Sequence, residues 1–273
     1  MITSVRNEQV KHIVSLHQTK GRKTSQQFFA EGRRFVGEAL MRSKRIEKIF
    51  YCPAKGSTWE REKLEELILE AGKLRIPAEE VSEDVMKRIS ATEEPQGILA
   101  LINQEEYSWD DIQIEPDTIL LILDGIRDPG NLGTILRASL AAGVKNVVLT
   151  RGTVDYYNPK VLRSSMGAVF SMCILQEIER PDIWAFCRQN HLNLVVSALE
   201  GQSVYRQKMD QSLPLALVIG SEANGVAPEF SEISPKKIMI PMQNNVESLN
   251  AALAAGILLF EIRRQADFLK NTK

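Results

Sequence analysis

Hydrophobic residues follow two different rhythms along the chain of 273 residues. In the first hundred residues, apolar positions at helical spacing alternate with short apolar runs that end at turn residues. This pattern predicts helices over residues 31–41 and 59–71, a capped helix start over residues 81–86, and strands over residues 46–52 and 97–102. Together these elements indicate a small α/β domain.

A second rhythm begins at residue 118. Residues 119–123 form a continuous apolar run, which is typical of a strand buried on both faces. Further strands are expected over residues 146–150, 192–199, 215–219 and 238–241, and helices over residues 132–142, the start of 159–170, and 248–264. Because strands alternate with helices, the sequence predicts a mostly parallel sheet with helices on both faces.

The two rhythms predict a domain boundary. We expect one domain over residues 1–102 and another over residues 118–273. The acidic and polar residues 103–117 between them are typical of a linker, which Trp109 would anchor to one of the domains.

Composition restricts the class of protein. Hydrophobic residues make up 44% of the chain and charged residues 25%, as in ordinary globular proteins. We expect neither a signal peptide nor a membrane span, since the first residues are polar and no apolar run is long enough. Cys52, Cys173 and Cys187 are widely spaced, which suits a reducing cytoplasm and does not indicate a metal site.

The charge is distributed unevenly. Residues 1–48 carry eleven Lys or Arg and four Asp or Glu, a balance of +7, which leaves −8 for the rest of the chain. Such asymmetry indicates a nucleic-acid footprint or, alternatively, a solvated basic helix face. Phe28 and Phe29, close to the basic cluster, are expected in the core rather than stacked on bases. The candidate phosphate contacts are Arg22, Lys23, Arg33 and Arg34.

Residues 123–137 form the first segment with candidate chemistry. They follow a buried strand and open a helix, a position where α/β proteins bind ligands. An unbroken helix would not align Asn131 with Arg137, but a turn at Gly133 would bring them together. The alternatives are a glycine-rich turn with a surface arginine, or a dinucleotide-binding loop that lacks the Gly-x-Gly-x-x-Gly spacing.

Two later segments also place polar groups beside strand ends. In residues 217–226, Glu222 comes just past an apolar strand, where it would either serve a ligand or cap the next helix. In residues 238–252, several neutral side chains gather at an expected helix N-terminus, where Ser248 is a plausible N-cap and polar or anionic groups would bind. These side chains are Asn244, Asn245, Ser248 and Asn250.

The three segments together resemble the motifs of the SpoU family of RNA 2′-O-methyltransferases, within the SPOUT group. The first motif is matched by Asn131 and Arg137, and the second, Gly-x-Glu-x-x-Gly, by Gly220, Glu222 and Gly225. The third motif is matched by Ile240, Pro241, Met242, Ser248, Leu249 and Asn250. Residues 28–35, Phe-Phe-Ala-Glu-Gly-Arg-Arg-Phe, resemble the family's N-terminal substrate-binding domain, whose fold is like ribosomal protein L30e.

The resemblance implies a fold, a cofactor and an assembly. It implies an α/β chain with a C-terminal parallel-sheet domain that contains a deep trefoil knot, after a small L30e-like α/β domain. It also implies a homodimer and S-adenosylmethionine as cofactor, without a metal. The implied cofactor contacts are Gly220, Ser221, Glu222, Gly225, Ile240, Met242, Ser248 and Leu249.

The resemblance further implies catalytic roles. Arg137 would be the catalytic residue, as a cation that orients phosphate and stabilises the developing alkoxide, because arginine is almost never deprotonated in proteins. The residues that would position Arg137 and the ribose are Asn131, Glu222, Ser248 and Asn250.

The substrate expected from the resemblance is RNA. The additional N-terminal domain favours ribosomal RNA, 23S in particular, over transfer RNA. A protein that binds RNA without methylating it is one alternative, and an NAD-binding oxidoreductase is another.

Overall fold

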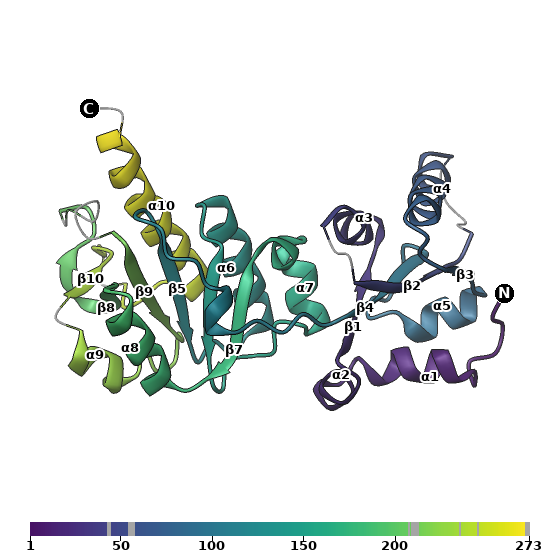
Figure 1. Cartoon of the computed structure of the whole chain (residues 1–273), viewed down its shortest axis with the longest axis horizontal. Helices are drawn as coiled ribbons and strands as arrows, with labels where there is room; N and C mark the ends of the chain where they lie inside the picture. Colours follow the sequence, from purple (N-terminus) through teal and green to yellow (C-terminus); the bar gives the residue numbers. More distant parts are fainter. Residues whose placement is uncertain are drawn as a thin grey trace. The chain divides into compact units, whose positions relative to one another are not determined.

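The computed structural model describes residues 1–42, 45–53, 58–206, 208, 213–234, 236–244 and 246–270. Contacts divide the chain into two units, Met1–Glu105 with Tyr157–Phe170, and Glu106–Tyr156 with Ser171–Lys273 (Figure 1). The first change of unit falls inside the expected linker, residues 103–117. The segment Tyr157–Phe170, expected from the sequence in the C-terminal domain, belongs to the first unit.

The first unit is built on a four-stranded sheet with the order β1-β4-β2-β3. Strand β4 is antiparallel to β1 and β2, and β2 is parallel to β3. Its strands are β1 (Gln27–Glu31), β2 (Ile46–Tyr51), β3 (Ala78–Glu80) and β4 (Ile98–Asn103). Its helices are α1 (Glu8–Ser15), α2 (Thr19–Ser25), α3 (Arg33–Arg42), α4 (Thr58–Lys73), α5 (Glu83–Ile89) and α7 (Pro159–Ser165). This confirms the predicted small α/β domain.

The core of the first unit explains why Tyr157–Phe170 belongs to it. Phe28 and Phe29 are buried, with 3% and 2% of their surface exposed, as predicted. The Phe28 ring lies 4.5 Å from the ring of Tyr157, whose hydroxyl accepts a hydrogen bond from the backbone of Glu105 at 2.9 Å. Aromatic contacts therefore attach this segment to β1.

The second unit contains a six-stranded, all-parallel sheet with the order β10-β8-β9-β5-β6-β7. Its strands are β5 (Ile119–Asp124), β6 (Asn146–Thr150), β7 (Cys173–Ile178), β8 (Asn193–Ser203), β9 (Leu215–Gly220) and β10 (Lys236–Met239). Its α-helices are α6 (Pro129–Ala141), α8 (Arg180–Gln189), α9 (Pro228–Ile233) and α10 (Ala251–Lys270). Its short 3-10 helix is η1 (Trp109–Asp111), whereas η2 (Ala168–Ser171) belongs to the first unit except for its last residue. This confirms the predicted parallel sheet.

Helices cover both faces of the second sheet. Leu120 and Ile122 of β5 pack in one core with residues of α8 and α9, while α6 and α10 pack together over the other face (Figure 1). Every residue of β5 is buried, as its continuous apolar run predicts. The ring of Trp109 stacks on the ring of Phe186 of α8, with 4.4 Å between the ring centroids. Trp109 therefore anchors the linker to the second unit, as expected of one of the two domains.

None of the helices in the described ranges is long and apolar enough to cross a membrane. Within the same ranges, no three His, Cys, Asp or Glu side chains gather in a group that could hold a metal ion.

Candidate active site

Parallel pairing brings the three sequence segments to one end of the second sheet. Strands β5 and β9 are neighbours, and Asp124, the last residue of β5, is paired with Gly220, the last residue of β9. The first two segments therefore leave the sheet side by side, at the carboxyl ends of strands, where α/β proteins bind ligands. The third segment follows β10 and leads into α10.

A cavity of about 500 Å³ lies at this end of the sheet. Every residue that the resemblance assigns to the cofactor lines it, from both the second and the third segment. These residues are Gly220, Ser221, Glu222, Gly225, Ile240, Met242, Ser248 and Leu249. The volume is within the range of sites that bury a small molecule.

Two glycines shape the loop that borders this cavity. A Cβ atom on Gly220 would lie 2.1 Å from the backbone of Gly225, and Gly225 has a left-handed backbone with φ of 63°. The Gly225 N–H also donates to the carbonyl of Ser221 at 2.8 Å. Any side chain at Gly220 would therefore force the loop open.

The cavity suits S-adenosylmethionine chemically. Ile219, Ile240 and Leu258 give it apolar walls for a purine ring, while tight loops bring backbone groups to its surface. Glu222 is its one acidic lining residue in the part of the chain that the structure describes, and it adds a negative charge that suits a cationic sulfonium. The residues present thus fit the cofactor.

A chain of hydrogen bonds connects the three segments. The side-chain amide of Asn250 donates to the side-chain oxygen of Asn131 at 2.9 Å, and Asn131 in turn donates to Oε1 of Glu222. The same Glu222 oxygen accepts from the backbone N–H of Ala251, the first residue of α10, at 3.2 Å. Three of the predicted catalytic residues are therefore joined directly.

The start of α10 differs from the prediction. Asn250, not Ser248, is the N-cap, because its Oδ1 accepts from the backbone N–H groups of Ala252 at 2.9 Å and Leu253 at 3.2 Å. Glu222 also caps a helix, but it caps α10 rather than the next helix in the sequence. Ser248 lies two residues before Asn250 and lines the cavity. Asn245, part of the same polar cluster in the sequence, is outside the described residues.

Arg137 is placed apart from this hydrogen-bonded chain. Helix α6 runs without a break from Pro129 to Ala141, so the turn expected at Gly133 does not occur. Arg137 therefore lies six residues along the same helix from Asn131, about 9 Å of rise further on. Its side chain is exposed and makes no hydrogen bond or ion pair with any residue of the described ranges.

One important residue escaped the sequence analysis. Asp124, 3% exposed, accepts hydrogen bonds from the Thr150 hydroxyl at 2.9 Å and the Ala227 backbone N–H at 2.8 Å. It also pairs with Arg180, whose Nη2 lies 3.0 Å away. Because Ala227 follows the Gly220–Gly225 loop, Asp124 ties the far end of that loop to the sheet. A charged residue ending an otherwise apolar strand was the available signal.

Other lining residues also escaped the sequence analysis. They come from the middle of β8 and from helices α9 and α10, and they include Ser197, Ala198, Leu199, Ser231, Ala254 and Leu258. The position of Ser197 near the end of a predicted strand was a usable signal, since parallel strands present ligand sites at that end.

The four candidate phosphate contacts in the first unit have different environments. Arg22 is 1% exposed, and its guanidinium donates to the carbonyls of Leu16 at 2.8 Å and His17 at 3.2 Å. It holds the turn between α1 and α2, so we remove it from the set. Arg33 is mostly buried and pairs with Glu60 at 3.2 Å. Lys23 and Arg34 are exposed.

Two family models match the chain. The model of the SpoU rRNA Methylase family matches residues 118–260, which span the sheet and cavity described above. The model of the MRM3-like substrate binding domain matches residues 7–100, within the first unit.

Similar proteins agree with these models. The 23S rRNA (guanosine(2553)-2′-O)-methyltransferase RlmP of Bacillus subtilis is 32% identical, over 96% of this chain and 98% of that protein. The human mitochondrial rRNA methyltransferase 3 is 30% identical, over 86% and 67%. The crystal structure of an AdoMet-bound rRNA methyltransferase from Sinorhizobium meliloti superposes with a TM-score of 0.85, at 30% identity, over 96% of this chain and 97% of that one. The chain belongs to the SpoU rRNA methylase family.

Proposed function

We propose that this protein transfers the methyl group of S-adenosylmethionine to a ribose 2′-hydroxyl of ribosomal RNA, with 23S rRNA as the substrate. The observation that carries the proposal is the single cavity lined by all eight expected cofactor residues, next to the bonded side chains of Asn131, Glu222 and Asn250. The relatives named as ribosomal RNA methyltransferases support the choice of substrate.

The reaction forms an O–CH₃ bond on the ribose and breaks the bond between sulfur and methyl carbon, whose electron pair stays on sulfur as a neutral thioether. The hydroxyl proton passes to solvent water. When bound, the cofactor supplies an electrophilic methyl group on a positively charged sulfur. The protein must hold the hydroxyl in line with that carbon at about 3 Å. The bonded trio of Asn131, Glu222 and Asn250 fixes the start of α10 and the Gly220–Gly225 loop for that purpose.

Arg137 is proposed as the catalytic cation. Its guanidinium would hold a phosphate of the substrate and stabilise the developing negative charge on the ribose oxygen. Its exposure, and its lack of a partner among the residues that the structure describes, leave it available to RNA. A role as proton acceptor would need a neutral guanidine, which proteins almost never contain.

The first unit is proposed to hold the RNA. Residues 1–102 would bind the substrate and residues 118–273 would carry out methyl transfer. The exposed residues Lys23 and Arg34 are the proposed phosphate contacts. Phosphate contacts release counterions, so replacing both with alanine should reduce the dependence of RNA affinity on salt by about two units in the log–log slope. An unchanged slope would place the phosphate contacts elsewhere.

A homodimer is part of the proposal. Helix α10 exposes about half of both Leu253 and Phe260, which are seven residues apart and so lie on one face of the helix. Together they give this face an apolar surface that a second copy of the chain would cover. A cytoplasmic location also belongs to the proposal, and it is supported by Cys52, Cys173 and Cys187, which form no disulfide with one another.

A methyl-transfer assay tests the proposal. Ribosomal RNA and transfer RNA are incubated separately with the protein and labelled cofactor, and the labelled RNA is hydrolysed with alkali. Methylation of a 2′-hydroxyl makes the adjacent phosphodiester resistant, so label should appear in alkali-resistant dinucleotides from 23S rRNA. Label found in transfer RNA alone would contradict the substrate. Absence of label from both RNAs, with the cofactor still bound, would favour a protein that binds RNA without methylating it.

A further inference from the structure

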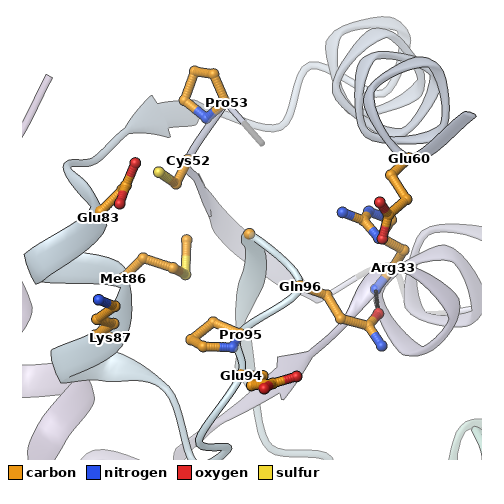
Figure 2. Close-up of a pocket in the computed structure, with 11 residues that line it drawn as sticks. Arg33, Cys52, Pro53, Glu60, Glu83, Met86, Lys87, Glu94, Pro95 and Gln96 are labelled. Carbon is orange, nitrogen blue, oxygen red and sulfur yellow. Dashed lines mark hydrogen bonds and ion pairs between the residues drawn. The ribbon is translucent and has the colours of Figure 1, made fainter. Parts of the chain in front are cut away.

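A second cavity, of about 380 Å³, lies within the first unit. Its wall comes from the start of α3, the end of β2, helices α4 and α5, and the turn that leads into β4 (Figure 2). Figure 2 shows Met86 of α5 and Gln96 of the turn on opposite sides of the hollow. The volume is at the lower end of the range for small-molecule sites, and it is sufficient for one nucleoside.

Arg33 lines this cavity, and Glu31 and Gly32, which precede it, hold the turn that forms another part of the wall. The Glu31 carboxylate accepts hydrogen bonds from the Thr92 hydroxyl at 2.6 Å and the Ala91 backbone N–H at 2.8 Å, which fixes the start of the turn. Gly32 has φ of 95°, and a Cβ atom there would lie 3.1 Å from the Gln96 side chain. The Gln96 side chain instead accepts from the Arg33 backbone N–H at 3.0 Å. The cavity is thus held in shape without a ligand.

The charges of the wall select the kind of ligand. Among the described residues of the wall, the charged side chains are three carboxylates, Glu60, Glu83 and Glu94, and two cations, Arg33 and Lys87. These carboxylates disfavour a phosphate and favour a ligand that presents N–H groups. Met86, 3% exposed, and Pro95 add apolar surface, on which a flat ring can lie.

Arg33 contributes a further feature. Its Nη1 pairs with Glu60, while its buried Nε has no hydrogen-bond partner among the residues described. A buried donor without a partner is uncommon in proteins. A small shift of this side chain would present the Nε–H group to a carbonyl oxygen of a ligand.

We infer that this cavity binds a single unpaired guanine base of the RNA substrate, separate from the nucleotide that is methylated. Guanine carries a carbonyl oxygen beside two adjacent N–H donors, N1–H and the 2-amino group, on one edge. The donors match carboxylates such as Glu83 and Glu94, and the carbonyl matches Arg33. Uracil has a single N–H between two carbonyls, while adenine and cytosine place their amino group beside an acceptor. The inference rests on the proposed RNA substrate, because the cavity itself specifies only the base.

Inosine provides a direct probe, since it is guanosine without the 2-amino group. Binding of the full-length protein is measured by fluorescence anisotropy with labelled pentanucleotides UUGUU, UUIUU and UUAUU. We expect UUGUU to bind about tenfold more tightly than the other two, as for one good bidentate base contact. Equal affinities for UUGUU and UUIUU would overturn the inference.

Variants assign the preference to this cavity. Glu83→Gln and Glu94→Gln keep the shape of each side chain, and each should reduce the preference for guanine to threefold or less, about the loss of one charge-assisted hydrogen bond. Glu93→Gln is the matched control, because Glu93 is exposed in the same turn and does not line the cavity. Thermal unfolding of each variant checks the fold. Undiminished preference in both lining variants, or an equal loss in the control, would refute this assignment.

The result is separable from the proposed function. A preference for guanine contributed by the methyl-transfer site would survive Glu83→Gln and Glu94→Gln. Suppose that no methyl transfer is detected while Glu83→Gln and Glu94→Gln reduce the preference for guanine. The guanine site would then be supported and the proposed reaction would be contradicted. Methyl transfer without a preference for guanine would support the proposed reaction and contradict the guanine site.

Discussion

The side chain of Asn250 donates a hydrogen bond to the side chain of Asn131 across 2.9 Å, although 119 residues separate them in the sequence. Asn250 also caps α10, and Asn131 also binds Glu222 at the edge of the cofactor cavity. One asparagine pair therefore couples the start of a helix to the loop on the other side of the cavity. Changes at either residue should affect cofactor binding before they affect the rest of the fold.

Replacing Asn250 with alanine tests this coupling. The variant loses the N-cap of α10, which costs about 1 kcal/mol of stability. Because the cavity includes Ser248 and Leu249 just before the cap, we expect cofactor affinity to fall about fivefold, the equivalent of that energy. Isothermal titration calorimetry measures the affinity. Gln243→Ala, an exposed change nearby, should leave it unaltered, and unchanged affinity in Asn250→Ala would argue against the coupling.

Asp124 should matter mainly for stability. In Asp124→Asn the buried partner of Arg180 loses its charge, and one amide oxygen cannot accept from Thr150, Arg180 and Ala227 together. We expect the free energy of unfolding to fall by about 3 kcal/mol, as when a buried ion pair is broken. Urea denaturation measures this. The control is Asp110→Asn, which changes an exposed aspartate. A similar fall in its free energy of unfolding would show that the buried network is not the cause.

Cys187 should be chemically inert in the folded protein. Burial raises the pKa of its thiol from 9.0 to about 12, so the reactive thiolate is scarce at about pH 8. Since folding raises this pKa, its contribution to stability is present below pH 9.0 and declines as the pH rises towards 12. Mass spectrometry after treatment with a thiol reagent should find Cys187 labelled only when denaturant is added. Rapid labelling without denaturant would contradict its burial.

The dimer should depend on the exposed face of α10. Aspartate at both Leu253 and Phe260 places charges on that face, and we expect the protein to become monomeric at micromolar concentration. Light scattering gives the mass. Leu69→Asp, at a residue 64% exposed on α4 of the first unit, should leave the dimer intact. A wild-type protein that is itself monomeric at this concentration would refute the proposed assembly.

The elements predicted best are those with strong local signals. The buried strand at residues 146–150 was predicted with the bounds that the structure gives, because its apolar run ends at turns on both sides. Helix α8 was missed, since only Ile183 and Cys187 of its residues are buried, and two apolar positions make a weak periodic signal. Strand β10 begins two residues earlier than expected, in a pairing with β8 that contains an irregularity.

The residues of the site could be predicted from the sequence, but the hydrogen bonds among them could not. Strand ends in a parallel sheet converge, so glycines and polar residues after β5 and β9 could be expected to meet. The bond between Asn131 and Asn250 depends on how α6 and α10 pack, which no local pattern encodes. The burial of Arg22 was equally hidden, because carbonyl groups of its own turn satisfy its charge. The trefoil knot and the domain limits 1–102 and 118–273 stay predictions.

Methyl transfer by Arg137→Ala tests the central claim most directly. The variant is assayed with 23S rRNA at saturating cofactor, and initial rates are compared with those of the wild type. We expect the rate to fall at least about a hundredfold, as when one group that stabilises a developing oxyanion is removed. Cofactor affinity should be unchanged, since Arg137 does not line the cavity. Arg188→Ala, an exposed arginine on α8, should keep the wild-type rate. A rate near that of the wild type in Arg137→Ala would contradict the account.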